Sequence, residues 1–164
     1  MALAVNDVTI DGFDSHRTST KDAFLALPAE RIQQFEANIL NPMVAAHLDP
    51  AGARRVAVVV IAHSDRQDSP GMSDDARRQD EARISGQRAD DATLFLFNQF
   101  LDEIQRAGGQ LIDADGLFDN SLAVSVVRVA AGAGHLVHAS PGNDESLRRQ
   151  NRRVVFIAMT FPKS

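Results

Sequence analysis

The chain of 164 residues contains no cysteine, no tryptophan and no tyrosine. Without cysteine it can form no disulfide, no iron–sulfur cluster, no cysteine-ligated zinc site and no thiol nucleophile. Sites that stack sugars or single-stranded nucleic acid usually use tryptophan or tyrosine. Such a site would need the nine phenylalanines alone, so we expect none. The sequence has no run of about 18 apolar residues, so we also expect no segment that inserts into a membrane.

The balance of residue types is that of one ordinary globular domain. Hydrophobic residues make up 44% of the chain and charged residues 24%, which excludes a disordered or fibrous chain. The net charge is −5, so we expect no nucleic-acid partner. The N-terminus lacks the basic and long apolar regions of a secretory signal. We therefore expect a single domain over residues 1–164 that acts where it is made, or one whose export segment or larger parent was removed.

Hydrophobic periodicity predicts a chain of the α/β (α+β) class. Apolar runs predict four strands, at residues 5–10, 56–61, 122–129 and 154–159. Apolar residues at three- and four-residue steps predict a helix from residue 29, a second over residues 86–106 and a short third over residues 145–152. The order β-α-β-α-β-(α)-β predicts one mixed sheet that is covered by helices on one face.

Three local features refine this prediction. The β-branched run 56–61 is typical of a central strand that is buried on both faces. Pro42 lies within the pattern of the first helix, so we expect a kink or break near Leu40. Residues 14–22 and 66–82 are polar, and we expect surface loops there, the second with some helix near its end.

Polar motifs accompany the apolar segments at three places. Residues 58–65 read Val-Val-Val-Ile-Ala-His-Ser-Asp, a strand that delivers a carboxylate at its carboxyl end. Residues 84–89 read Ile-Ser-Gly-Gln-Arg-Ala, a helix start with Ser85 as its cap, and residues 148–154 read Arg-Arg-Gln-Asn-Arg-Arg-Val. In this order the segments resemble the OmpA-like peptidoglycan-binding domain, whose motifs are Gly-His-Thr-Asp, Leu-Ser-x-x-Arg-Ala and Asn-Arg-Arg-Val. The core of the resemblance covers residues 55–160.

The resemblance implies a site for the diaminopimelate branch of peptidoglycan stem peptides. This branch ends in an ammonium and a carboxylate on one carbon. On this interpretation Asp65 binds the ammonium, and the planar fork of Arg88 binds the carboxylate. We expect Arg88 in the first turn of its helix, where backbone N–H groups also favour an anion. The expected ligand-binding set is completed by His63, Ser64, Ser85 and Arg148.

The chain departs from the family pattern around the expected site. The charged segment 66–82 makes the spacing between Asp65 and Arg88 longer than in compact family members. Glu81 stands where the family pattern has asparagine, so its carboxylate could repel the ligand or pair with Arg88. Segment 107–131 is also longer than usual. These departures leave open whether Glu81 and the 66–82 loop block the site.

Plainer interpretations stay open for the same charged residues. Asp65 and Arg88 could form a structural ion pair at the end of the sheet. The arginine pair 152–153 is expected to pack its stems along neighbouring elements and to pair with acids, whereas Arg148 has a better chance of lying near the site. Asn151 is expected to make a capping or turn hydrogen bond.

Other chemistries fit the sequence less well. His63-x-Asp65 and the His-x-x-His segment 135–138 resemble metal-ligand pairs, but in a loop or strand the two histidines of the second would point apart. Residues 113–119 lack the glycine and glutamate positions of a calcium loop. Ser64 lies between His63 and Asp65 on a strand, where neighbours alternate sides and form no catalytic triad. No cofactor, metal or catalytic residue is therefore expected.

The sequence thus predicts a non-enzymatic binding module. It would hold peptidoglycan and anchor a larger envelope or secretion-system assembly to the cell wall, in the periplasm or cell envelope. An alternative is the same fold used as a structural or protein-interaction component with the wall-binding site altered. The charged insertion and the missing export signal favour this alternative, in which the chain could act in the cytoplasm. A wall hydrolase is a weaker alternative, which only His63 and Asp65 motivate.

Overall fold

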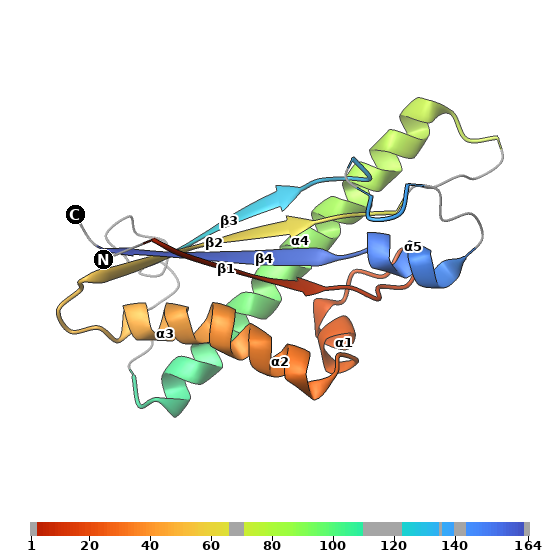
Figure 1. Ribbon diagram of the computed structural model, residues 1–164. Coiled ribbons are helices and arrows are strands. Elements are labelled where there is room, and N and C mark those ends of the chain that lie inside the picture. The colour runs from red at the N-terminus through yellow and green to blue at the C-terminus, as the bar shows by residue number, and fades with distance from the viewer. Residues whose placement is uncertain (1–2, 66–70, 110–122, 135, 140–143, 163–164) are drawn as a thin grey trace.

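Four strands form one sheet in the computed structural model of the protein, which describes residues 3–65, 71–109, 123–134, 136–139 and 144–162 (Figure 1). The strands are β1 (Ala4–Ile10), β2 (Arg54–Ala62), β3 (Val124–Ala130) and β4 (Val154–Pro162), in the spatial order β1-β4-β2-β3. β4 runs antiparallel to both β1 and β2, whereas β2 and β3 are parallel. The predicted mixed sheet is therefore confirmed.

The helical elements alternate with the strands as predicted. They are α1 (Thr20–Leu25), α2 (Ala29–Phe35), the π-helical turn η1 (Glu36–Leu40), α3 (Asn41–His47), α4 (Asp74–Arg106) and α5 (Glu145–Asn151). α2, η1 and α3 follow one another and pack with α4 against the same side of the sheet, while α5 lies beyond the end of β2 (Figure 1). None of the described helices is long and apolar enough to cross a membrane.

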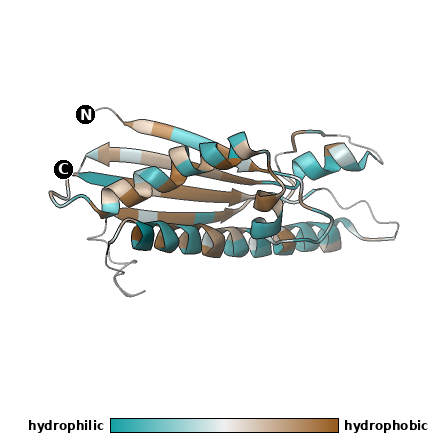
Figure 2. Cartoon of the chain, turned by 90° about the horizontal axis from the view of Figure 1, so that it is seen from below, coloured by the Kyte–Doolittle hydropathy of each residue, from teal (hydrophilic) through white to brown (hydrophobic). Residues whose placement is uncertain are grey.

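The described helices cover only one face of the sheet. Val58 and Val60 of β2 are fully buried, whereas Val59 and Ile61 beside them are partly exposed. The prediction that this run is buried on both faces is therefore wrong. Successive side chains of a strand point to opposite faces, and only one of these faces packs on helices. Figure 2 shows the apolar strands beside helices whose outer sides are largely hydrophilic.

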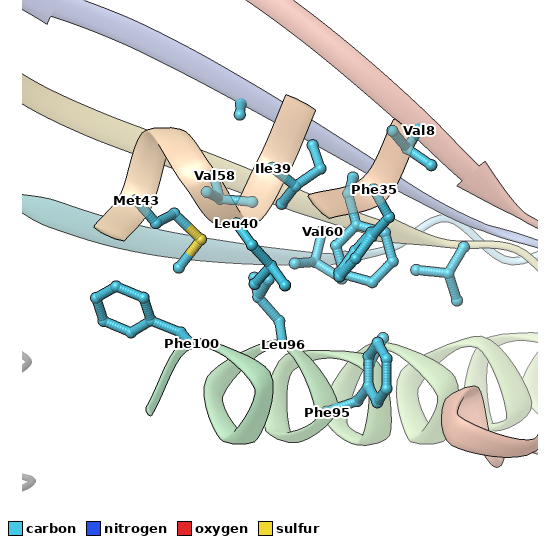
Figure 3. Close-up of a cluster of buried hydrophobic side chains, with 14 of the residues drawn as sticks. Val8, Phe35, Ile39, Leu40, Met43, Val58, Val60, Phe95, Leu96 and Phe100 are labelled. Carbon is cyan, nitrogen blue, oxygen red and sulfur yellow. The ribbon is translucent and has the colours of Figure 1, made fainter. Parts of the chain in front are cut away.

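Aromatic and aliphatic side chains fill the space between the sheet and the helices (Figure 3). The ring of Phe35 lies 5.2 Å from the ring of Phe24 and 5.2 Å from that of Phe156 in β4. Leu96 and Phe100 of α4 close the same layer from the other side and are at most 1% exposed. This apolar layer fixes α4 against β2, and so sets where the side chains of α4 meet the end of that strand.

Pro42 distorts the first helical segment without breaking it. Its ring lacks an N–H and crowds the carbonyl of the preceding turn, so a regular α-helix cannot pass through it undisturbed. The chain forms the wide turn η1 directly before α3, which carries Pro42 in its first turn. Ile39 and Met43 on either side of Pro42 stay buried. The predicted disturbance near residue 40 is therefore a π turn.

α4 begins much earlier than predicted. Its N-cap is Ser73, whose hydroxyl accepts the N–H of Ala76 at 3.2 Å, and the helix itself begins at Asp74. Ser85 is therefore not the cap of this helix. Arg88 lies deep within it, so the expectation that Arg88 gains from a helix N-terminus is wrong.

Two polar segments with the composition of loops carry helix. Residues 74–82 belong to α4, where acidic and basic side chains three residues apart form ion pairs that favour the helix. α1 begins at Thr20, inside the polar segment 14–22, because the hydroxyl of Ser19 accepts a backbone N–H of the first turn. In both cases local side-chain contacts decide the conformation, and hydrophobic periodicity does not report them.

Candidate functional site

Polar side chains from distant segments meet at the carboxyl end of β2. His63, Ser64 and Asp65 follow the strand directly and are all buried. α4 passes this end and brings Arg88, which is 1% exposed, as Asp65 is. α5 lies beyond the same end and brings Arg148 to Asp65. The fold therefore gathers an acid and several arginines that lie far apart in the chain.

The carboxylate of Asp65 is bound by protein groups on both oxygens. Arg148 Nε donates to Oδ2 at 2.6 Å, and Asn151 Nδ2 donates to Oδ1 at 3.1 Å. A second guanidinium, that of Arg152, approaches Oδ2 to 3.9 Å. The side chain of Arg148 is 25% exposed and that of Arg152 only 3%. Arg148 is thus the partner of Asp65 that stands at the boundary with solvent.

The guanidinium of Arg88 is bound by backbone carbonyls. Nε donates to the carbonyl of Arg17 at 2.9 Å, and Nη1 donates to that of His63 at 2.9 Å. Nη2 donates to the carbonyl of Asp14 at 3.4 Å. The guanidinium carbon also lies 5.2 Å from the centre of the Phe13 ring. Arg88 therefore ties the loop between β1 and α1 to the end of β2.

Burial changes the acid–base properties of Arg88. Loss of water around the guanidinium, together with repulsion by Arg152, lowers the pKa of Arg88 to about 10, and the attraction of Asp65 offsets only part of this effect. Arg88 stays protonated at neutral pH. Within the described part of the chain, Asp65 forms its ion pairs with Arg148 and Arg152. A direct structural pair between Asp65 and Arg88 is therefore not the arrangement found.

Arg152 joins the cluster to α5 and to the first loop. Its Nη1 donates to the carbonyl of Phe13 at 3.0 Å, and its two terminal nitrogens donate to the carboxylate of Glu145 at 2.7 and 2.9 Å. These contacts agree with the expectation that this arginine pairs with an acid. The buried polar atoms that have no hydrogen-bond partner among the described residues include Arg152 Nε and Ser64 Oγ. Such orphaned atoms are uncommon in protein interiors.

Ser85 and Asn151 connect the cluster to neighbouring turns. The hydroxyl of Ser85 donates to the carbonyl of Ala82 at 3.0 Å and accepts the N–H of Gly132 at 3.1 Å. Gly132 has a φ of 56°, which explains the glycine at this turn. Asn151 accepts the N–H of His138 at 2.9 Å and donates back to its carbonyl at 3.0 Å. Asn151 therefore does more than cap a turn, since the same amide also holds the carboxylate at the end of β2.

Other sequence-derived features lie beside the cluster or outside the described residues. Glu81 lies on α4, where its Oε1 is 3.8 Å from Nε of Arg77. Its carboxylate therefore forms an ion pair within the helix. Residues 66–70 of the charged loop, the segment 113–119 and His135 lie outside the described residues. The described residues contain no cluster of histidines and acids that could hold a metal ion.

A surface cavity of about 260 Å³ is lined in part by the loop that Arg88 holds. Its walls include Asp14, Arg17 and Arg149, and neither Asp65 nor Arg88 lines it. The carbonyls of Asp14 and Arg17 accept from Arg88, so the same loop contributes to the cavity and to the buried cluster.

The expected site residues contribute to the cluster in different ways. Asp65, Arg88 and Arg148 place charged groups in it, whereas His63 supplies a carbonyl to Arg88. Arg152 and Asn151 are missing from the expected ligand-binding set, yet they hold or approach the carboxylate of Asp65. Both belong to the third matched motif, Asn-Arg-Arg-Val, and that motif is the signal that could have found them.

Comparisons with known proteins find a likeness among solved structures. Among solved structures, the chain is similar to the cell wall anchor of the T6SS from Pseudomonas aeruginosa, with a TM-score of 0.42 and 19% sequence identity over 98% of this chain and 88% of that chain. No family model matches the chain, and no curated protein matches it. A likeness of this size carries no argument about function, so the function has to be argued from the chain's own residues.

Proposed function

We propose that the chain binds, without covalent chemistry, the diaminopimelate head of a peptidoglycan stem peptide, and thereby anchors a larger envelope assembly to the cell wall. The observation that carries this proposal is the make-up of the buried cluster. Arg88 and Arg152 share it with one fully buried carboxylate, that of Asp65. Arg152 Nε and the hydroxyl of Ser64 lack partners among the described residues. Buried donors without partners beside two guanidiniums suit an added carboxylate, in addition to the carboxylate of Glu145 that already pairs with Arg152.

The ammonium of the ligand would replace a cation that is already bound. Arg148 Nε donates to Asp65 Oδ2 at 2.6 Å. The side chain of Arg148 is partly exposed, so it reaches Asp65 from the solvent side. An ammonium at that place would keep the carboxylate paired while Arg148 moves into water. Because the binding-competent state then has to be populated first, the apparent dissociation constant equals the intrinsic one divided by the fraction of molecules in which Arg148 has left Asp65.

The carboxylate of the ligand would approach Arg88 and Arg152 together. Arg88 uses three N–H groups on carbonyls, and a guanidinium carries five, so it can donate to a further oxygen. A new anion would also counter the repulsion between the two arginines that helps to lower the pKa of Arg88. The resemblance in the three motifs supports the same ligand. On this proposal the chain acts in the periplasm or cell envelope with a larger assembly as its partner.

A second candidate function is favoured by the burial of Asp65 and Arg88. Asp65 and Arg88 are each 1% exposed and are already bound by protein groups. On this alternative the cluster is a structural lock that joins the first loop, β2, α4 and α5. The chain would then serve as a structural or protein-interaction component, and a wall ligand would find no entry.

Co-sedimentation with purified sacculi separates the two candidates. The wild type should be retained, and Asp65→Asn and Arg88→Lys, which keep size and most contacts, should bind at least about tenfold more weakly because a charge-assisted contact is lost. Arg83→Lys and Asp90→Asn on the exposed side of α4 are the matched controls. Circular dichroism must first show that all variants are folded.

The Arg148→Met variant gives the sharpest distinction. If Arg148 competes with the ligand, its removal leaves retention on sacculi unchanged or stronger, because the closed state loses its competing cation. If neither Arg148→Met nor the wild type is retained on sacculi, and the variant is less stable than the wild type, the result supports the structural lock. Equal retention of Asp65→Asn and the wild type, both folded, refutes the proposed site. Release of soluble muropeptides would instead point to the hydrolase.

A further inference from the structure

The two edge strands of the described sheet differ in how they are protected from pairing. β1 carries Asn6 and the exposed Asp7 in its middle, and a charged residue discourages the addition of another strand. The charged residue of β3, Arg128, is paired with Asp90 of α4. β3 reads Val-Ser-Val-Val-Arg-Val-Ala and pairs with β2 in an unbroken register, without proline or bulge. Val127 and Val129 are 54% and 40% exposed. Such an edge is a template for a further strand.

The direction of the free hydrogen-bonding groups on β3 follows from its contacts with β2. Ala131 donates its N–H to Ala62 at 2.9 Å, and the carbonyl of Ala123 accepts the N–H of Val56 at 2.7 Å. Backbone groups of successive residues in a strand point to opposite sides. The odd-numbered residues of β3 therefore bond to β2, and the even-numbered ones direct N–H and C=O away from the sheet. Val126 and Arg128 are the central pair of these outward residues.

We propose that β3 pairs with β3 of a second copy of this chain, antiparallel and about a two-fold axis at Val127. In this register Val126 stands opposite Arg128 of the second copy, and the two exchange both backbone hydrogen bonds. Val127 meets its own copy in the closer, non-hydrogen-bonded pair, where side chains of an antiparallel ladder pack. The outward backbone groups of β3 are thus all used, and both edges are covered at once.

Charge disfavours a neighbouring register. An axis shifted to Arg128 would put two arginines directly opposite each other, which is unfavourable. In the proposed register each Arg128 faces a valine, and its guanidinium keeps the contact with Asp90 of its own α4. The strand is therefore complementary to itself without any rearrangement. A partner strand of another protein would need no such symmetry.

The helices beneath the sheet would lie on one side of the dimer. α4 packs under both β2 and β3. A two-fold axis perpendicular to the sheet keeps both copies of α4 on the same side of it. Two copies would thus form one continuous sheet with both copies of α4 beneath it.

Sedimentation velocity of the full chain, at concentrations from about 1 μM to about 1 mM, tests the proposal. These concentrations cover the dissociation constants of weak to moderate association. We expect a concentration-dependent dimer. Arg128→Pro removes an outward N–H and leaves the ladder with β2 intact, because proline is tolerated on the open side of an edge strand. This variant should weaken the dimer at least about tenfold, since two symmetry-related hydrogen bonds are lost.

Matched variants keep the result free of folding effects. Arg128→Ala loses the contact with Asp90 but keeps the N–H, so it should dimerise as the wild type does. Val127→Glu, on the axis, should give a folded monomer, whereas Val5→Glu on the exposed edge β1 should leave the dimer intact. A wild type that stays monomeric at every concentration overturns the proposal. So does a dimer that survives Arg128→Pro, or one that Val5→Glu abolishes. Retention on sacculi plays no part in this test.

Discussion

The protein has two kinds of interior, and they depend on different kinds of contact. Between the sheet and the helices, Phe35 packs against three other rings at centre distances of 5.2 to 5.8 Å. At the end of β2, Arg88 and Asp65 are instead held by particular donors and acceptors. Apolar contacts have little direction, so neighbours can adjust to a change, whereas a buried polar group needs its own partner. We expect both interiors to stabilise the fold, the first through packing and the second only while each polar group keeps its partner.

The largest effect is expected in the apolar interior. Phe35→Ala removes the ring at the centre of the aromatic contacts and should lower the free energy of unfolding by about 3–5 kcal/mol. Leu25→Ala, at an exposed side chain of α1, is the control and should change the free energy of unfolding by less than about 0.5 kcal/mol. Urea unfolding measures both. A loss of under about 1 kcal/mol in Phe35→Ala would mean that the apolar layer is not the main source of stability.

Arg88→Met asks whether the polar interior also contributes stability. Methionine fills the space but leaves the carbonyls of Asp14, Arg17 and His63 without their donor, so we expect a loss of about 2–4 kcal/mol. Urea unfolding gives the value, and faster tryptic cleavage at the first loop should accompany it. Arg83→Met on the exposed side of α4 serves as the control. A variant as stable as the wild type would remove the distinction between the two interiors.

Asp65→Asn sharpens the comparison, because it removes charge and almost no volume. The amide still accepts from one neighbour, but Arg148 loses its ionic partner, and we expect a loss of about 1–3 kcal/mol in the free energy of unfolding. Asp90→Asn, in an exposed pair with Arg128, should change stability by less than about 0.5 kcal/mol. If both variants behave alike, burial of Asp65 has no special consequence.

The smallest effect is a pH dependence at the rim of the cluster. The hydrogen bond from Arg152 lowers the pKa of Glu145 below its ordinary value of 4.5 in the folded chain. Stability from this pair is therefore fully present above pH 4.5 and is lost as the pH falls through the lowered pKa. Since Glu145 is largely exposed, the contribution should be at most about 1 kcal/mol. In Glu145→Gln this part of the acid response should be absent, as thermal unfolding between pH 6 and pH 3 can show.

The apolar interior could be predicted from the sequence because periodicity reports it directly. The four strands and the apolar stripe through Phe35, Ile39 and Met43 follow from spacing alone. The errors lie where local contacts override that signal. α4 begins at Asp74 because a serine cap and ion pairs stabilise a charged segment as helix. The burial of β2 on one face only depends on which helices pack on the sheet, and a single strand carries no record of that.

The polar interior could be predicted only in outline. The three motifs indicate that Asp65, Arg88 and Arg148 belong together, and the fold does gather them. The motifs do not report that Arg148 rather than Arg88 binds Asp65, or that backbone carbonyls hold Arg88. Carbonyl acceptors are present at every residue and leave no mark on the sequence. The partner of a buried cation therefore has to be read from the structure.

An NMR titration of the wild type with free diaminopimelate tests the central claim most directly. The side-chain amide of Asn151 donates to the carboxylate of Asp65, and the backbone amide of Ser64 belongs to the residue directly before it. We predict saturable shifts of both signals at ligand concentrations up to about 10 mM, and their loss in folded Asp65→Asn. Signals that stay unchanged in the wild type over this range, or that shift equally in the variant, would contradict the account.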